Sequence, residues 1–129
     1  MQTQRSEHIT IHGRFPSLNE YINVCRRNRY TANRMKKQET SRAANAARDV
    51  SPFHEPVTVE FLWVEKDKRR DIDNVAFAKK FVLDGLVQAG VIANDNARHV
   101  VGLSDTFAYD KNNPRVEVTI CSSAKSDKS

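Results

Sequence analysis

Cysteine is scarce in this sequence, and the spacings that thiol chemistry needs are missing. Cys25 and Cys121 are the two cysteines in 129 residues, and neither lies in a CxxC or Cys/His pattern. Zinc sites and disulfide frameworks depend on such patterns. The four histidines are scattered along the chain, at His8, His12, His54 and His99. The sequence therefore predicts reduced thiols and no zinc site.

Long hydrophobic runs are also missing. No stretch reaches the roughly 18 apolar residues that a membrane-spanning helix needs, and the N-terminus lacks the apolar segment of a signal peptide. A chain of 129 residues, 39% of them hydrophobic, has material for a single core but not for two. We expect one cytoplasmic domain with no membrane contact and no small-molecule cofactor.

Positive charge is in excess, and it is concentrated in one segment. The formal net charge is +5, and residues 17–49 alone hold eight basic side chains against the acids Glu20, Glu39 and Asp49. A basic excess favours polyanionic partners such as nucleic acid. The alternative is an ordinary solvated helix face. The eight basic residues are Arg26, Arg27, Arg29, Arg34, Lys36, Lys37, Arg42 and Arg48.

The stretch from Arg69 to Asp95 carries the side chains best suited to chemistry. Asp71 and Asp73 lie two residues apart, with Asn74 next, and Asp95 follows a helical pattern. Residues two apart in extended backbone point to the same side, so Asp71 and Asp73 can converge if Ile72 faces the core. Mg²⁺ prefers such carboxylates together with phosphate oxygens. The alternative is helix capping at Asp73 or Asn74 and a simple turn at Asp95.

Periodicity predicts the first three elements of secondary structure. Residues 7–13 alternate polar and apolar side chains and predict a half-buried strand. Ser17 followed by Glu20 predicts a capping box at the start of a helix. Residues 32–48 are rich in alanine and long polar side chains, which favour a second helix.

The second half of the chain predicts one helix between strands. Residues 57–64 alternate apolar side chains as the strongest strand, and residues 74–89 predict a helix ended by Gly90. Residues 98–109 and 115–121, joined by the turn-rich DKNNP, predict a hairpin. This order indicates an α+β (α/β) two-layer domain over residues 1–121, a mixed sheet of about four strands packed with helices. The polar residues 122–129 predict a disordered tail.

The run DIDN, then KKFVLDGLVQAGVI, then ND resembles the core of the RusA family of Holliday junction resolvases. SLNEYINVCRRNRY followed by MKK resembles the N-terminal part of family members from phages and prophages, so the resemblance covers residues 7–121. It implies a RusA-like fold, a homodimer, and an endonuclease that resolves four-way branched DNA in recombination and repair. The implied cofactor is Mg²⁺, for which Mn²⁺ can substitute.

The resemblance also implies roles for single residues. Asp71, Asp73 and Asp95 match the family's catalytic metal ligands, and Lys80 matches its catalytic lysine. That lysine lies three residues later than in the archetype, and Asn94 stands where relatives carry a second acid. Positions seven apart on a helix return to nearly the same face, which favours Lys80, above Asp73, with Lys79 as the alternative.

Basic side chains are needed to bring DNA phosphates close to three carboxylates. Tyr30 is a candidate for stacking on an exposed base near the junction centre, and the alternative is that its ring is simply packed. Two other functions stay open on the residues alone, a non-catalytic DNA-binding protein and a less selective duplex or flap nuclease. The predicted DNA-binding residues are Arg26, Arg27, Arg29, Lys36, Lys37, Arg69 and Arg70.

Overall fold

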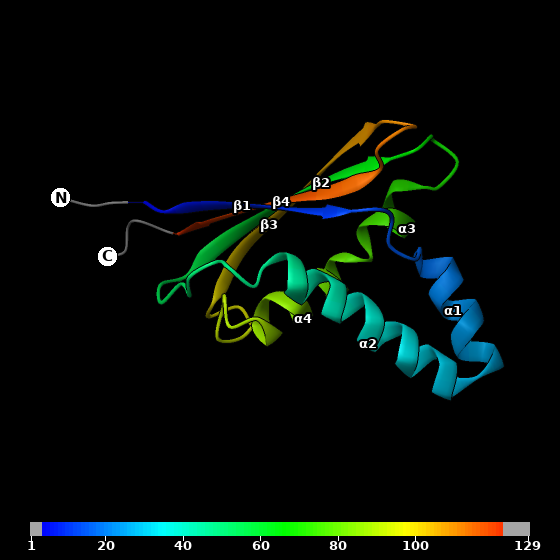
Figure 1. The fold of residues 1–129 in the computed structure, drawn as a ribbon, viewed down its shortest axis with the longest axis horizontal. Helices are drawn as coiled ribbons and strands as arrows, with labels where there is room; N and C mark the ends of the chain where they lie inside the picture. The colour runs from blue at the N-terminus through cyan, green and yellow to red at the C-terminus, as the bar shows by residue number, and fades with distance from the viewer. Residues whose placement is uncertain (1–3, 123–129) are drawn as a thin grey trace.

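The computed structural model describes residues 4–122 as one mixed sheet with its helices on one face (Figure 1). Its strand order is β1-β4-β2-β3. This arrangement confirms the predicted α+β two-layer fold. The strands are β1 (Ser6–His12), β2 (Val57–Glu65), β3 (Val100–Tyr109) and β4 (Arg115–Ser122), and the helices are α1 (Leu18–Arg27), α2 (Arg29–Ala46), α3 (Ile72–Ala76) and α4 (Lys79–Gln88).

The last two strands do not form the predicted hairpin. β3 pairs in parallel with one edge of β2, and β4 pairs antiparallel with the other edge and with β1. Trp63 of β2 accordingly has Phe107 on one side and Val116 on the other. A parallel pair needs a crossover connection, and α3 and α4 supply it. The alternating apolar side chains of β2 suit either neighbour, so periodicity alone does not choose between them.

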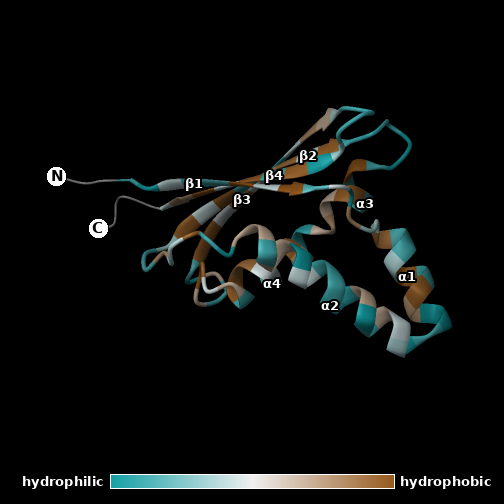
Figure 2. Ribbon diagram, in the orientation of Figure 1, coloured by the Kyte–Doolittle hydropathy of each residue, from teal (hydrophilic) through white to brown (hydrophobic). Residues whose placement is uncertain are grey.

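The core lies between the sheet and the helices. Val57, Val59, Phe61 and Trp63 alternate along β2 and are almost fully buried, whereas Glu60 between them is exposed. This pattern confirms the predicted strand. The hydrophobic colouring of Figure 2 is concentrated on the sheet, and the joined end of α1 and α2 is mainly hydrophilic.

The capping box predicted for the first helix is present. Glu20 N–H donates to Ser17 Oγ at 3.2 Å, and Ser17 N–H donates to Glu20 Oε1 at 2.9 Å. α2 begins three residues before the predicted start because Asn28 caps it. The Asn28 side chain accepts hydrogen bonds from the N–H groups of Tyr30 and Thr31, so only this residue separates the two basic helices.

The single helix predicted for residues 74–89 is two helices. α3 ends at Ala76 and α4 begins at Lys79, with i to i−3 hydrogen bonds tightening the turn between them, such as Phe81 N–H to Ala78 O at 2.9 Å. The Phe77 ring, at the break, packs against Tyr21 and Phe81. The break changes which residues after position 78 share a face with Asp73.

The helix predicted for residues 74–89 does end at Gly90, which follows α4. Gly90 adopts a φ of +79°, its N–H donates to Val87 O, and Val91 N–H donates to Leu86 O. These two bonds form a Schellman motif, which suits glycine because L side chains are strained at positive φ.

The ends of the described chain are tied together. Ser122, placed in the predicted tail, is instead the last residue of β4, and Arg5 N–H donates to its hydroxyl at 2.8 Å. The rest of that tail, 123–129, lies outside the described residues. Within residues 4–122, no helix is long and apolar enough to cross a membrane.

Candidate active site

The two neighbouring aspartates lie at the start of α3. Asp71 is the N-cap residue in extended backbone, and its carboxylate makes no capping hydrogen bond. Asp73 lies in the first turn and accepts a hydrogen bond from Asn74 N–H at 3.0 Å. Ile72 does not face the core as predicted, because it is helical and 56% exposed. Both carboxylates are exposed. The capping alternative is wrong for Asp73 and Asn74, because the N-cap is Asp71 and both of these residues lie inside α3.

Asp73 lies on an open groove of about 640 Å³ between α3, α4 and β3. Lys79 from α4 and Asp105 from β3 also line this groove, so three charged side chains from three elements meet there. The remaining lining is apolar and consists of Ile72, Ala76, Phe77 and Phe107.

Asp105 is the functional candidate that sequence reasoning missed. Its Oδ2 lies 2.5 Å from Lys79 Nζ, and its Oδ1 accepts a hydrogen bond from Trp63 Nε1 at 2.8 Å. The available signal was a lone acid between Leu103 and Phe107, on the side of β3 that continues the apolar side of β2. Such a position normally holds an apolar residue, so a carboxylate there indicates a specific partner.

The side chains of the adjacent residues Lys79 and Lys80 lie in different environments. Lys79 is half-buried and lines the groove with Asp73, whereas Lys80 is exposed and does not line it. Among residues 4–122, Lys80 makes no ion pair, either with Asp84, one helical turn further on, or with another acid. Asp84 instead lines a second groove, between α2 and α4. The break after Ala76 explains the difference, because the predicted angle between Asp73 and Lys80 assumed a continuous helix.

Asp95 lies apart from this groove. It is exposed in the connection between α4 and β3, and within the described residues no three His, Cys, Asp or Glu side chains are gathered closely enough to hold a metal ion. Mg²⁺ is often held by one or two carboxylates, with phosphate oxygens and water completing its coordination. The exposed carboxylates of Asp71 and Asp73 fit an ion of that kind.

Arg70, the residue before Asp71, is held inside the protein. Its guanidinium donates to Phe15 O at 2.9 Å and pairs with Glu20 at 2.7 Å and with Glu65 at 3.5 Å. Glu65 ends β2, is 6% exposed and also pairs with Arg14. These bonds tie the backbone in front of the aspartates to both α1 and the sheet.

Glu20 joins the capping box to this network. Burial raises the pKa of its carboxyl, but the hydrogen bond from Ser17 and the charge of Arg70 lower it more, so the net pKa lies below the ordinary value of 4.5. The carboxylate form is therefore favoured, and it holds Arg70 and the start of α1 together.

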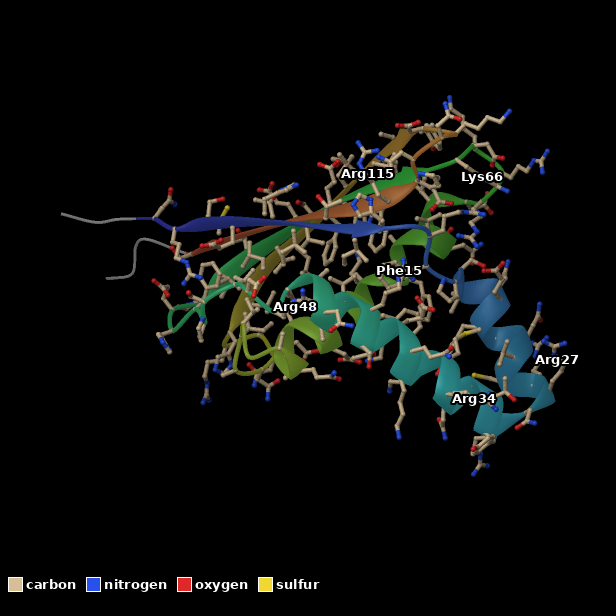
Figure 3. The ribbon with its side chains drawn as sticks, in the orientation of Figure 1. Phe15, Arg27, Arg34, Arg48, Lys66 and Arg115 are labelled. Carbon is tan, nitrogen blue, oxygen red and sulfur yellow. The ribbon has the colours of Figure 1, made fainter. Side chains whose placement is uncertain are left out.

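Most basic side chains of residues 17–49 are exposed and form no ion pair within residues 4–122, whereas Arg42 is half-buried and paired. Glu39 pairs with Arg42 and Glu20 with Arg70, so these acids are used inside the fold. Figure 3 shows Arg27 and Arg34 projecting outward at the joined end of α1 and α2. Five predicted DNA-binding residues of this segment are exposed and form no ion pair within residues 4–122: Arg26, Arg27, Arg29, Lys36 and Lys37.

Two more side chains predicted to contact DNA, Arg69 and Tyr30, are also exposed. The Arg69 side chain is 86% exposed and has only a 3.7 Å contact with Asp67. Tyr30 is 73% exposed and lines the groove between α2 and α4, of about 730 Å³, together with Lys36 and Lys37. Tyr30 is therefore open to contact rather than packed.

Comparison with known proteins connects this geometry to a family. One solved structure, titled "Crystal structure of HypE-HypF complex", is 14% identical with a TM-score of 0.37, and the match covers 92% of this chain and 31% of that one. No curated protein sequence matches the chain. Residues 15–121 match the family model described as "Endodeoxyribonuclease RusA", which includes every residue of the groove. The chain belongs to the RusA endodeoxyribonuclease family.

Proposed function

We propose that this protein is a Mg²⁺-dependent endonuclease that resolves Holliday junctions in DNA recombination and repair. The observation that carries the proposal is the meeting of Asp73 and Lys79 in one groove. Membership of the RusA family supports DNA as the substrate and four-way junctions as its form.

The proposed ligands are Asp71, Asp73 and Asp95, the first two at the start of α3. Held by these residues, Mg²⁺ would lower the pKa of a water molecule and would neutralise charge on the phosphate being cut. Asp71 and Asp73 are exposed and thus accessible to an ion that arrives with the DNA. Asp95 is proposed as a third ligand, and because it is not gathered with the other two in this structure, the connection between α4 and β3 would have to bring it to them.

The proposed catalytic lysine is Lys79, with Lys80 kept as the alternative. The compact charge of a lysine amine suits stabilisation of the negative charge that develops on phosphate oxygens. Lys79 shares the groove with Asp73, and Phe77 and Phe107 are among the apolar residues that line it. Lys80 is exposed and does not line this groove.

Exposed basic side chains are the proposed DNA contacts. They attract phosphates from any sequence, so junction selectivity is expected to follow the shape of the DNA. Arg70 is proposed to affect DNA binding indirectly, by holding the backbone next to Arg69 and Asp71 in place. Its own guanidinium already has three partners inside the protein. The proposed direct contacts are Arg26, Arg27, Arg29, Lys36, Lys37 and Arg69.

A homodimer is proposed because resolving a four-way junction takes two strand cuts, and two copies supply two sites. Light scattering is expected to give twice the chain mass of 14.7 kDa. A monomer that cuts both strands would contradict this part of the proposal.

The deciding experiment compares a synthetic four-way junction with linear duplex of the same sequence, in Mg²⁺, Mn²⁺ or EDTA. We expect junction cleavage with either metal, none with EDTA, and little cutting of duplex. Asp73→Asn is expected to abolish cleavage and keep junction binding, because it removes a ligand charge with almost no change in shape. Undiminished cleavage by Asp73→Asn would refute the metal site.

The same gel separates the alternative functions. A non-catalytic DNA-binding protein predicts no metal-dependent cutting of either substrate. A less selective nuclease predicts similar cutting of duplex and junction. Each outcome differs from the selective, metal-dependent cleavage that we expect.

A further inference from the structure

Asp105 is held at both carboxylate oxygens by groups from different elements. Trp63 Nε1 of β2 donates to Oδ1 at 2.8 Å, and Lys79 Nζ of α4 lies 2.5 Å from Oδ2. Trp63 is 1% exposed and its ring stacks on Phe61, so its indole N–H is fixed by the core. The chain Trp63–Asp105–Lys79 therefore leads from the rigid sheet to the groove.

Stability alone is a poor reason for a carboxylate at this position. Asp105 stands beside Phe61 in the sheet register, with Leu103 and Phe107 as its neighbours on the same side of β3. Burying charge costs free energy unless it is paired, and replacing a buried ion pair by apolar side chains is often neutral or stabilising. A neutral Asn would give the Trp63 N–H the same acceptor, so that hydrogen bond does not require a charge, which directs attention to what the charge does for Lys79.

We propose that Asp105 is a positioning residue that orients the Lys79 amine for the reaction. The inference rests on the proposed function, because it concerns the same site. Lysine has a flexible stem of four carbons and loses about 2 kcal/mol of rotamer entropy when fixed. Asp105 restricts that freedom before DNA arrives, because its Oδ2 lies 2.5 Å from the Lys79 amine and its side chain is only 22% exposed. Trp63 in turn fixes the carboxylate.

Single-turnover cleavage of the four-way junction by Asp105→Asn tests this role. The Asn side chain still accepts from Trp63 but no longer attracts Lys79. We expect cleavage to slow about 10- to 100-fold, the effect of a small displacement of a reacting group. The junction Kd and the Mg²⁺ concentration for half-maximal rate are expected to stay at their wild-type values.

Glu117→Gln provides a matched control. It breaks the Arg115–Glu117 ion pair of β4, which has a 2.6 Å contact and side chains 23% and 24% exposed, close to the values for Lys79 and Asp105. Glu117 does not line the groove. We expect its cleavage rate to equal that of the wild type, which separates positioning from a general loss of stability.

The last comparison is between the cleavage rates of the single variant Lys79→Ala and the double variant Lys79→Ala/Asp105→Asn. Both variants are expected to cut equally slowly, because Asp105 has nothing to orient once the amine is gone. Junction binding and thermal unfolding establish that each variant is folded. Trp63→Phe, which keeps an aromatic ring and removes the N–H donor, is a second route to loosening Asp105 and is expected to slow cleavage as well.

Three results would overturn the inference. They are a wild-type rate for Asp105→Asn, a double variant slower than Lys79→Ala, and a raised Mg²⁺ requirement in Asp105→Asn, which would make Asp105 a metal ligand. A wild-type protein that fails to cut junctions in Mg²⁺ is a different result. It would overturn the proposed function itself, and this inference with it.

Discussion

Of the two adjacent lysines, Lys79 lines the groove with Asp73 and Lys80 does not. This difference predicts a large effect of substitution at Lys79 and a small one at Lys80. Lys79→Ala is expected to slow junction cleavage about 100-fold or more, the usual effect of removing a group that stabilises developing charge. Lys80→Ala is expected to change the rate less than about threefold, as is common for exposed positions. Rates measured on one junction under single-turnover conditions compare them directly, and the reverse order would place Lys80 at the reacting phosphate.

Glu20 gives the protein a pH-dependent contribution to stability. Its folded pKa lies below 4.5, so its carboxylate stabilises the fold above that pH, and the contribution is lost as the pH falls through the lowered pKa. Glu20→Gln keeps a neutral capping side chain but loses the pairing with Arg70. We expect a loss of under about 1 kcal/mol in the free energy of unfolding at pH 7, shrinking towards zero at acidic pH.

Urea unfolding of wild type and Glu20→Gln at several pH values measures this difference. Glu55→Gln is the control, because Glu55 is exposed and forms no ion pair in the described part of the chain. Its stability should follow the wild type throughout. A Glu20→Gln deficit that stays constant from neutral to acidic pH would show that the carboxylate charge is not responsible.

α2 and α4 pack closely against each other at Gly85. A Cβ added there would lie 2.6 Å from Ala43 Cβ, 2.8 Å from Ala44 N and 2.9 Å from Thr40 O. Because two of these atoms belong to the α2 backbone, Gly85→Ala is expected to force the helices apart and to cost about 1–3 kcal/mol. Thermal unfolding measures the loss, and Gly85→Ala/Ala43→Gly should recover only part of it. Full recovery would show that the contact with the Ala43 side chain was the obstacle.

The elements that local chemistry defines were predictable. The capping box at Ser17, the alternation of β2 and the glycine that ends α4 each depend on residues close in sequence. The separation of α3 from α4 was not, since the helical period continues through Phe77 and the break reflects packing of its ring against Tyr21. The pairing of β4 with β2 depends on residues about 60 positions apart, which turn signals do not reveal.

The residues of the groove were likewise predictable only where they are close in sequence. Asp71 and Asp73 were recognisable as a pair because they are close in sequence, whereas Asp105 comes 26 residues after its partner Lys79. Nothing local to β3 indicates that Trp63 and Lys79 converge on that carboxylate. The choice between Lys79 and Lys80 could not be made from the sequence for a related reason. A two-residue break between α3 and α4 changes the direction in which the side chains after it point, relative to Asp73.

The basic segment lies on two helices that project from the sheet, and this arrangement predicts a salt-dependent DNA surface (Figure 3). The substitution of Arg26, Arg27 and Arg29 by alanine is expected to weaken junction binding. It should also lower the slope of log Kd against log salt by about 0.9 for each phosphate that the protein no longer neutralises. Fluorescence anisotropy across a salt series gives both quantities.

Arg48→Ala with Lys111→Ala is the control for this prediction. Both side chains are exposed, and Arg48 lies towards the other end of α2 from Arg34 (Figure 3). We expect a smaller change per removed charge than with the three arginines. An equal change would mean that only net charge matters, and unaltered binding by the triple variant would make the segment a solvated face.

The position of β4 inside the sheet governs when this protein can fold during translation. β4 is the last of the four strands to leave the ribosome, yet it pairs with both β1 and β2, in a register that sets Ser6 opposite Cys121. A nascent chain that ends at Tyr109 can pair β2 with β3, but it leaves β1 with no strand to join. Contacts between residues this distant make folding slow. Completion of the sheet therefore waits for β4, and β1 is the strand that a chaperone would find unpaired.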